Sequence, residues 1–246
     1  SHIVGDLLNP NKKIEFDGKI KKEQKNQRIA FEGKTKDDLV SYKVAYNNRL
    51  KLDWKNEDIA VPLFIGLKLI TDYPLEEIRK YIDWTFFFSA WEMRGSYPKI
   101  LNDPVKGKTA RELFENANSL LDEIIDNGLL KANVAYGFWP ASSEKDDIVI
   151  YKNEERADEL VKFNMLRQRK IKKGITLSLS DFIAPNNSEI EDYIGAFAVT
   201  TGINAKDLSE KYERKNDDYN SIMVKTIADR LAEALAELMH QRVRKE

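Results

Sequence analysis

The chain has 246 residues, with 42% hydrophobic residues, 33% charged residues and a formal net charge of -1. This composition is typical of a globular protein with a sizeable buried core and excludes a disordered chain. A charge so close to zero provides no basic field of the kind that attracts nucleic acids, so we expect no nucleic-acid partner.

Cysteine and histidine usage narrows the chemistry further. The chain has no cysteine, which excludes a disulfide framework, a thiolate nucleophile and an iron–sulfur cluster. Its two histidines, His2 and His240, stand near opposite ends, which argues against a catalytic triad or a multi-histidine metal site. No apolar run approaches the roughly 18 residues that span a bilayer, and the first residues lack the layout of a signal peptide. We therefore expect a cytoplasmic protein without a membrane partner.

The first fifty residues predict two amphipathic helices. Isolated apolar residues recur in a stretch rich in Lys and Gln, residues 12–36, which divides near Gly33. Thr35 can cap the second helix. The first fifty residues also have an excess of basic over acidic side chains. This excess indicates either a solvated helix face or an arm that packs on a neighbouring domain.

The middle of the chain predicts extended segments followed by helices. Residues 59–71 suggest two short extended pieces, and Pro74 then opens a short helix that ends near Tyr81. The clearest helix covers residues 108–127, where Thr109 can cap the start. Its apolar residues at helical spacing are Leu113, Phe114, Ala117, Leu120, Leu121 and Ile124.

From residue 132 the pattern changes to strands. Residues 132–140 and 147–151 predict a hairpin around a polar turn at 142–146. Two further segments, 160–165 and 176–182, are also expected to be strands. No internal repeat or Pro-, Gly- or Ser-rich linker interrupts the chain, so the pattern favours one α+β domain.

The last third combines a strand with two helices. Residues 192–200 are almost wholly apolar, which predicts a central strand buried on both faces. Helices are expected over 204–212 and from Asp217 onward. Because no Gly, Asn or Pro stops the last helix before Glu246, we expect the chain to be a fragment of a longer protein.

Asp83 is the first candidate functional residue. It precedes a helix start and stands among the aromatic residues Tyr81, Trp84, Phe86, Phe87, Phe88 and Trp91. One interpretation is that its carboxylate caps the helix. The other is that it binds the ammonium group of a ligand such as a methionine derivative, while the aromatic rings hold a sulfonium or an adenine ring.

A row of carboxylates on the last helix is the second candidate. Asp229, Glu233 and Glu237 are spaced by four and share one face. The apolar residues Val224, Ile227, Leu231, Leu235 and Leu238 form a separate stripe that predicts the core face. Arg230 is expected to lie away from the acidic row. The row is either a solvated surface or a surface that meets hydrogen-bond donors of a partner.

The segment Tyr136-Gly-Phe-Trp-Pro-Ala141 is the third candidate. Gly137 within a strand predicts a bulge or a close approach of another backbone. Core packing is the simplest explanation for the aromatic residues around it.

Several long blocks resemble the activation domain of cobalamin-dependent methionine synthase, and they follow the family's order over roughly residues 74–246. Phe86 stands where that family often has a proline. The blocks are Ile82-Asp-Trp-Thr-Phe-Phe-Phe-Ser-Ala-Trp91, Phe138-Trp-Pro-Ala141, Asp146-Asp-Ile-Val-Ile-Tyr151, Leu166-Arg-Gln168, Asp181-Phe-Ile-Ala-Pro185, Asp192-Tyr-Ile-Gly-Ala-Phe-Ala-Val-Thr-Thr-Gly202, Asp217-Asp-Tyr-Asn220, Ile222-Met-Val-Lys225, Ala228-Asp-Arg-Leu-Ala-Glu-Ala234 and His240-Gln-Arg-Val-Arg244.

The resemblance implies a fold and a domain organisation. The expected fold is α+β, a C-shaped single domain with a central antiparallel sheet, N-terminal helices and a long C-terminal helix. Residues 1–5 resemble the junction that leaves the cobalamin-binding domain. Residues 6–50 would then be the linker and N-terminal helices of the activation region, and residues 51–246 the activation domain, incomplete at its C-terminus.

The resemblance also implies an activity. The parent enzyme transfers a methyl group from methyltetrahydrofolate to homocysteine through cobalamin, which is bound by the neighbouring domain. The activation domain binds S-adenosylmethionine and docks on the cobalamin-binding domain, so that oxidised cobalamin is remethylated with an electron from a flavodoxin-type donor. Zinc belongs only to the homocysteine domain of the parent enzyme, and this chain alone is expected to be inactive.

Site residues follow from the matched blocks. Asp83 matches the carboxylate that binds the amino group of S-adenosylmethionine, and Asp229 and Glu233 match acidic positions on the face that approaches the corrin. The family's Arg-x-x-x-Gly-Tyr segment and its later pair of tyrosines have no counterpart among the 246 residues, so we expect this chain to bind S-adenosylmethionine weakly or not at all. The alternative function is a non-enzymatic docking module for a corrinoid protein.

Overall fold

The computed structural model describes residues 10–32, 39–54, 59–171 and 174–246. Contacts divide the chain into two compact units, Ser1–Asp53 with Met165–Phe182, and Trp54–Asn164 with Ile183–Glu246. Helices and one antiparallel sheet make up the fold, which confirms the predicted α+β class. The predicted C shape and the domain boundaries stay predictions.

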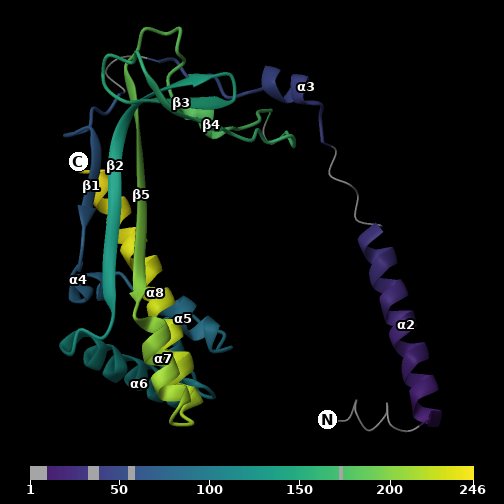
Figure 1. Cartoon of the computed structure of the whole chain (residues 1–246). Coiled ribbons are helices and arrows are strands. Elements are labelled where there is room, and N and C mark those ends of the chain that lie inside the picture. Colours follow the sequence, from purple (N-terminus) through teal and green to yellow (C-terminus); the bar gives the residue numbers. More distant parts are fainter. Residues whose placement is uncertain (1–9, 33–38, 55–58, 172–173) are drawn as a thin grey trace. The chain divides into compact units, whose positions relative to one another are not determined.

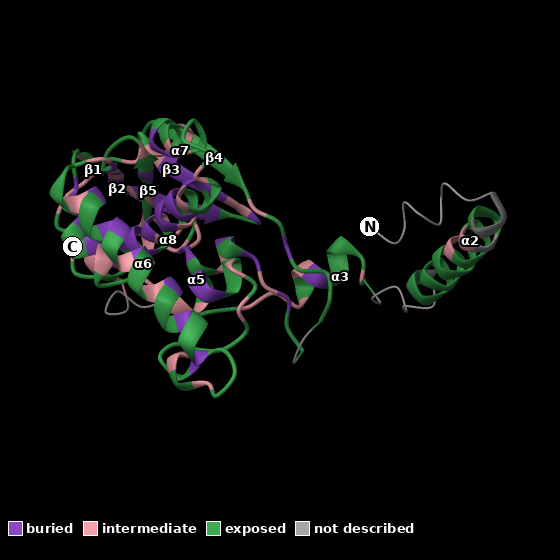
Figure 2. Cartoon of the chain, turned by 90° about the horizontal axis from the view of Figure 1, so that it is seen from below, coloured by how far each residue is buried: buried purple, intermediate pink, exposed green. Residues whose placement is uncertain are grey.

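The first unit contains the helices α2 (Pro10–Glu32) and α3 (Tyr42–Asn47). Helix α2 runs without a break to Glu32 and is exposed along nearly its whole length (Figure 2). The predicted division at Gly33 and the cap at Thr35 lie outside the described residues. Helix α3 is instead capped by Ser41, whose hydroxyl accepts a hydrogen bond from the Val44 amide at 3.3 Å.

A buried ion pair holds the second segment of this unit. Arg167 and Asp181 approach to 2.6 Å, with side chains only 1% and 3% exposed. Asp181 also accepts a hydrogen bond from the amide of Ser178, which bends the chain into the 3₁₀ helix η3 (Leu179–Phe182). The strand predicted over 176–182 is therefore wrong. Thr176 makes only an isolated parallel bridge with Arg49.

Five described strands form the antiparallel sheet of the second unit (Figure 1). The long strand β2 is central, because it pairs with three other strands along its two edges. The hairpin between β2 and β3 is confirmed, although its turn is shorter than predicted: Glu144 pairs with Asp147, and Lys145 turns the chain with φ +56°. The strands are β1 (Gly66–Ile70), β2 (Lys131–Glu144), β3 (Asp147–Tyr151), β4 (Glu159–Asn164) and β5 (Asp192–Ile203).

Two strand predictions need correction. Residues 59–71 contain one described strand, β1, rather than two extended pieces. Strand β5 is not central, because β2 is its one partner among the described strands. It is also not buried on both faces, because most of its residues are partly or fully exposed. Its exposed residues include the small Ala196 and Ala198, which an open sheet face tolerates at little cost.

Helices flank this sheet and were largely predicted. Helix α6 begins at Gly107, so Thr109 lies inside it and does not cap it. The carboxylate of Asp103 instead accepts hydrogen bonds from the amides of Val105 and Lys106, both at 2.9 Å. The elements are α4 (Leu75–Arg79), α5 (Trp84–Ala90), η2 (Lys99–Asn102), α6 (Gly107–Asp126), α7 (Ala205–Glu213) and α8 (Asp218–Val243).

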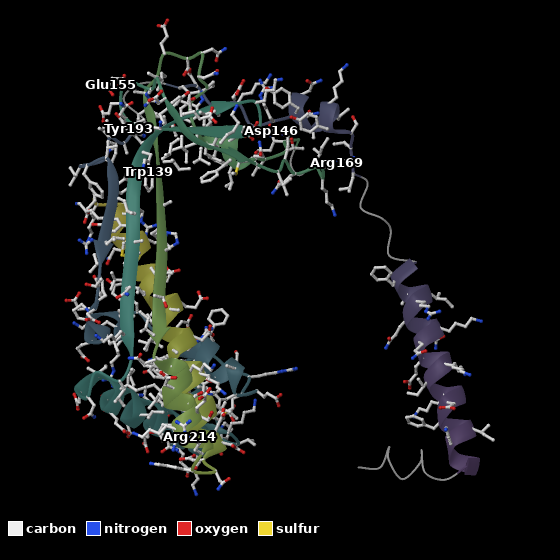
Figure 3. All side chains as sticks on the ribbon, viewed as in Figure 1. Trp139, Asp146, Glu155, Arg169, Tyr193 and Arg214 are labelled. Carbon is white, nitrogen blue, oxygen red and sulfur yellow. The ribbon has the colours of Figure 1, made fainter. Side chains whose placement is uncertain are left out.

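The core lies between the sheet and these helices. Helix α8 runs beside β5 in Figure 1, and the hydroxyl of Thr201 on β5 donates a hydrogen bond to the carbonyl of Ala228 on α8. The five apolar residues predicted as the core stripe of α8 are all buried, as are five of the six named on α6, with Phe114 partly buried against them. At the other end of this unit, Trp139 within β2 lies near Tyr193 at the start of β5, far from Arg214 after α7 (Figure 3).

Gly137 is a position where the sheet requires the absence of a side chain. A Cβ atom there would lie 2.2 Å from the carbonyl oxygen of Gly66 on β1 and 2.8 Å from the indole of Trp139. The sequence-based prediction of a close backbone approach is therefore confirmed. The packing of β1 onto β2 depends on this glycine.

We predict that Gly137→Ala lowers the free energy of unfolding by about 1–3 kcal/mol, because the added methyl group forces β1 away from β2. Urea denaturation measures the difference. Gly202→Ala on β5 is the matched control, since a Cβ atom there has no neighbour within 4 Å. Equal stability of the two variants would contradict this packing.

Candidate functional site

Asp83 begins helix α5 as its N-cap. Its Oδ1 accepts a hydrogen bond from the amide of Thr85 at 2.8 Å, so the capping interpretation is confirmed. Two buried rings behind it, Phe87 and Phe88, anchor α5 in the core. The carboxylate of Asp83 itself stays exposed to solvent and retains hydrogen-bonding capacity beyond the cap.

The aromatic residues around Asp83 divide into two groups. Trp84 and Trp91 pack in edge-to-face and tilted contacts with core rings such as Phe87, and so belong to the core. Phe86 and Tyr81 remain accessible, with 60% and 37% exposure. Of the rings that the sequence suggested for ligand binding, these two are the ones free to contact a ligand.

The acidic row of α8 lies on the exposed side of that helix. Burial of Ile227, Leu231 and Leu238 fixes the rotation of α8 about its axis. Asp229, Glu233 and Glu237 consequently point away from the core, and all three are exposed.

A pocket of about 380 Å³, open to solvent, lies between α5 with the segment before it and α8, and its volume is within the size range of small-molecule sites. The pocket brings Asp83 and Glu233 together, two of the three residues predicted from the sequence. Helices α5 and α8 also pack directly against each other. The lining residues are Tyr81, Asp83, Phe86, Arg230, Glu233, Ala234 and Glu237.

Asp229 is placed differently. It does not line the pocket and instead forms a hydrogen-bonded ion pair with Arg230, whose guanidinium lies 6.0 Å from the centre of the Phe86 ring. The expectation that Arg230 lies away from the acidic row is therefore wrong. Among the described residues, its buried Nε makes no hydrogen bond.

Arg230 was not predicted to belong to the site, because the prediction relied on acidic residues that repeat every four positions along the helix. Neighbouring residues on a helix point in directions about 100° apart, and the long side chain of Arg230 can span that angle to reach Asp229. The sequence feature that could have indicated this ion pair is the adjacency of Asp229 and Arg230 next to the predicted core stripe.

Tyr81 also lines the pocket. Its hydroxyl donates a hydrogen bond to the side-chain carbonyl of Gln241, one turn beyond Glu237 on α8. This contact joins the segment before Asp83 to the last helix.

The third sequence candidate, residues 136–141, belongs to the core and not to this pocket. The Tyr136 hydroxyl donates a hydrogen bond to Glu246 at 2.9 Å. Burial, together with that hydrogen bond to Glu246, raises the pKa of Tyr136. The core-packing interpretation of this segment is thus confirmed.

The electrostatics of the pocket favour a cationic ligand. Three carboxylates, from Asp83, Glu233 and Glu237, face one guanidinium, and that guanidinium is already paired with Asp229. Within the described ranges, no His, Cys, Asp and Glu side chains gather as a metal site would require. No described helix has the length and apolarity needed to cross a membrane.

Fold and pocket together define a class: an α+β domain with an acidic and aromatic pocket between two helices. The model of the family "Vitamin B12 dependent methionine synthase, activation domain" matches residues 74–246. The chain belongs to this family.

A solved structure supports the same assignment. A crystal structure described as the MetH reactivation domain bound to AdoHcy shares 42% sequence identity with this chain, with a TM-score of 0.81. The match covers 84% of this chain and 64% of the solved chain. The chain therefore spans less than two thirds of that relative's length.

The capping role of Asp83 predicts a difference between two substitutions. Asp83→Ala removes the acceptor for the Thr85 amide and is expected to lower the free energy of unfolding by about 1 kcal/mol. Asp83→Asn keeps a capping oxygen and is expected to leave stability nearly unchanged. Thermal and urea unfolding of both variants checks this, and equal destabilisation would show that the charge, rather than the cap, stabilises α5.

Proposed function

We propose that the pocket between α5 and α8 binds S-adenosylmethionine, and that the chain serves as the reactivation module of a cobalamin-dependent methionine synthase. The observation that carries the proposal is the convergence of Asp83 and Glu233 in one pocket with an accessible aromatic ring, Phe86. The family match and the AdoHcy-bound relative support it.

The residues present fit the ammonium and sulfonium groups of this ligand. Asp83 has free acceptor capacity for the ligand ammonium group, because the cap hydrogen bond occupies Oδ1 in one direction only. Phe86 and Tyr81 offer faces for a sulfonium or an adenine ring. S-adenosylmethionine supplies the methyl group, while these side chains bind and orient it.

The proposal extends to the whole enzyme of which this chain would be a part. That enzyme would be a methyltransferase that moves a methyl group from methyltetrahydrofolate to homocysteine through cobalamin. The cobalamin-binding domain and a flavodoxin-type electron donor would be the partners of this module, in the cytoplasm. Zinc would belong to the homocysteine domain, and the chain alone would lack methyltransferase activity.

Asp229 and Glu233 have distinct places in this proposal. Asp229 is exposed outside the pocket and would face the corrin, with Arg230 holding its carboxylate. Glu233 lines the pocket, so it would lie between the ligand and the corrin-facing surface.

We predict that Asp83→Asn weakens S-adenosylmethionine binding at least about tenfold, because a neutral amide replaces a charge-assisted hydrogen bond. Because the pocket carboxylates are exposed and screened by salt, we expect weak binding. Ligand-observed NMR with millimolar S-adenosylmethionine suits the measurement of such weak binding. Asp83→Asn keeps the cap, so the loss would not arise from unfolding.

The alternative function, a docking module for a corrinoid protein, gives a different result in the same experiment. Its supporting observation is the exposed Asp229 outside the pocket. Absence of S-adenosylmethionine binding to the unmodified chain, combined with retained binding of a corrinoid protein that Asp229→Asn abolishes, would favour it over our proposal.

A further inference from the structure

The carboxylate of Glu237 lines the pocket but has no role in the function proposed above. We propose that Glu237 makes the pocket selective for charge, so that it holds the sulfonium S-adenosylmethionine more tightly than the thioether S-adenosylhomocysteine. This inference rests on the proposed function and assigns a specificity-determining residue to the same site.

Position on α8 distinguishes Glu237 from Glu233. Arg230 and Glu233 are three residues apart and therefore neighbours on the helix surface, so the guanidinium partly offsets the charge of Glu233. Glu237 lies two turns from Arg230, about 10 Å along the helix. It is the carboxylate of the α8 wall whose field Arg230 offsets least.

No described basic group neutralises Glu237. Within the part of the chain that the structure describes, neither Glu237 nor Glu233 forms an ion pair, whereas Arg230 is engaged by Asp229. The wall of the pocket that contains Glu237 therefore keeps its negative charge. The exposed ring of Phe86 adds a π face that also attracts a cation.

Carboxylates on two different elements suit a ligand with two cationic groups. Asp83 stands at the start of α5 and Glu237 on α8, and both line the same pocket. In S-adenosylmethionine, two methylene groups and the α-carbon separate the sulfonium from the ammonium. With the ammonium at Asp83, the sulfonium lies within the pocket that Glu237 borders.

The charge of the ligand changes when its methyl group is transferred. S-adenosylmethionine carries a sulfonium, an ammonium and a carboxylate, for a net charge of about +1 near neutral pH, whereas S-adenosylhomocysteine has lost the sulfonium charge and is close to neutral. A negative wall attracts the first and not the second. Methyl transfer would thus weaken the hold of the pocket on the product and favour its release.

The test is a comparison of two ligands on two variants. Glu237→Gln keeps the size of the exposed side chain and removes its charge, and is expected to weaken S-adenosylmethionine binding about three- to tenfold, as one charge a few ångströms away does in a partly aqueous site. S-adenosylhomocysteine affinity is expected to change less than twofold. Glu115→Gln, an exposed substitution on α6 outside the pocket, is the matched control for net charge.

The outcomes separate the two proposals. Weakening of S-adenosylmethionine alone by Glu237→Gln, and of neither ligand by Glu115→Gln, supports charge selection. Equal weakening of both ligands, or no weakening of either, overturns charge selection but leaves the proposed function intact. Failure of S-adenosylmethionine to bind either this chain or a longer chain that carries the Arg-x-x-x-Gly-Tyr segment would overturn both. Raising the salt concentration should reduce the preference for the sulfonium, because the carboxylate is exposed and screened.

Discussion

Burial of the apolar stripe of helix α8 is the constraint on which the rest of the second unit depends. Leu231 and Leu235 are fully buried, and Thr201 on β5 ties the helix to the sheet through the carbonyl of Ala228. A helix fixed in this way can present only one face to solvent, and in this chain that face carries the acidic row. The geometry of the pocket is therefore a consequence of core packing and not of the acidic residues themselves.

Helix α5 supplies the opposite wall by the same logic. Its two buried rings, Phe87 and Phe88, hold a helix of only two turns, and Asp83 stabilises the first turn while it remains exposed. A single carboxylate thus has two compatible roles, because the cap occupies one of several acceptor positions. For Asp83, the structural and the ligand-binding interpretations are complementary.

The sequence predicted the long helices and the central hairpin because their signals are local and periodic. It also placed Asp83 and Glu233 among the candidate site residues, since unusual residue blocks carry the family resemblance. It failed where long-range contacts decide: the Arg167–Asp181 ion pair turns a predicted strand into η3, and the apolar β5 lies beside one strand rather than between two. Arg230 was missed because its side chain bends back to Asp229, which the spacing along a helix does not reveal.

We propose that a cationic ligand binds in the pocket between α5 and α8. The most direct measurement is the change in backbone amide NMR shifts on addition of S-adenosylmethionine, with Thr85 as the reporter because its amide donates to Asp83. We predict shifts at Thr85 and Phe86 and along residues 230–237. Shifts confined to another surface, such as the cavity beside Asp72 and Lys131, with Thr85 unchanged, would show that the ligand does not bind between α5 and α8.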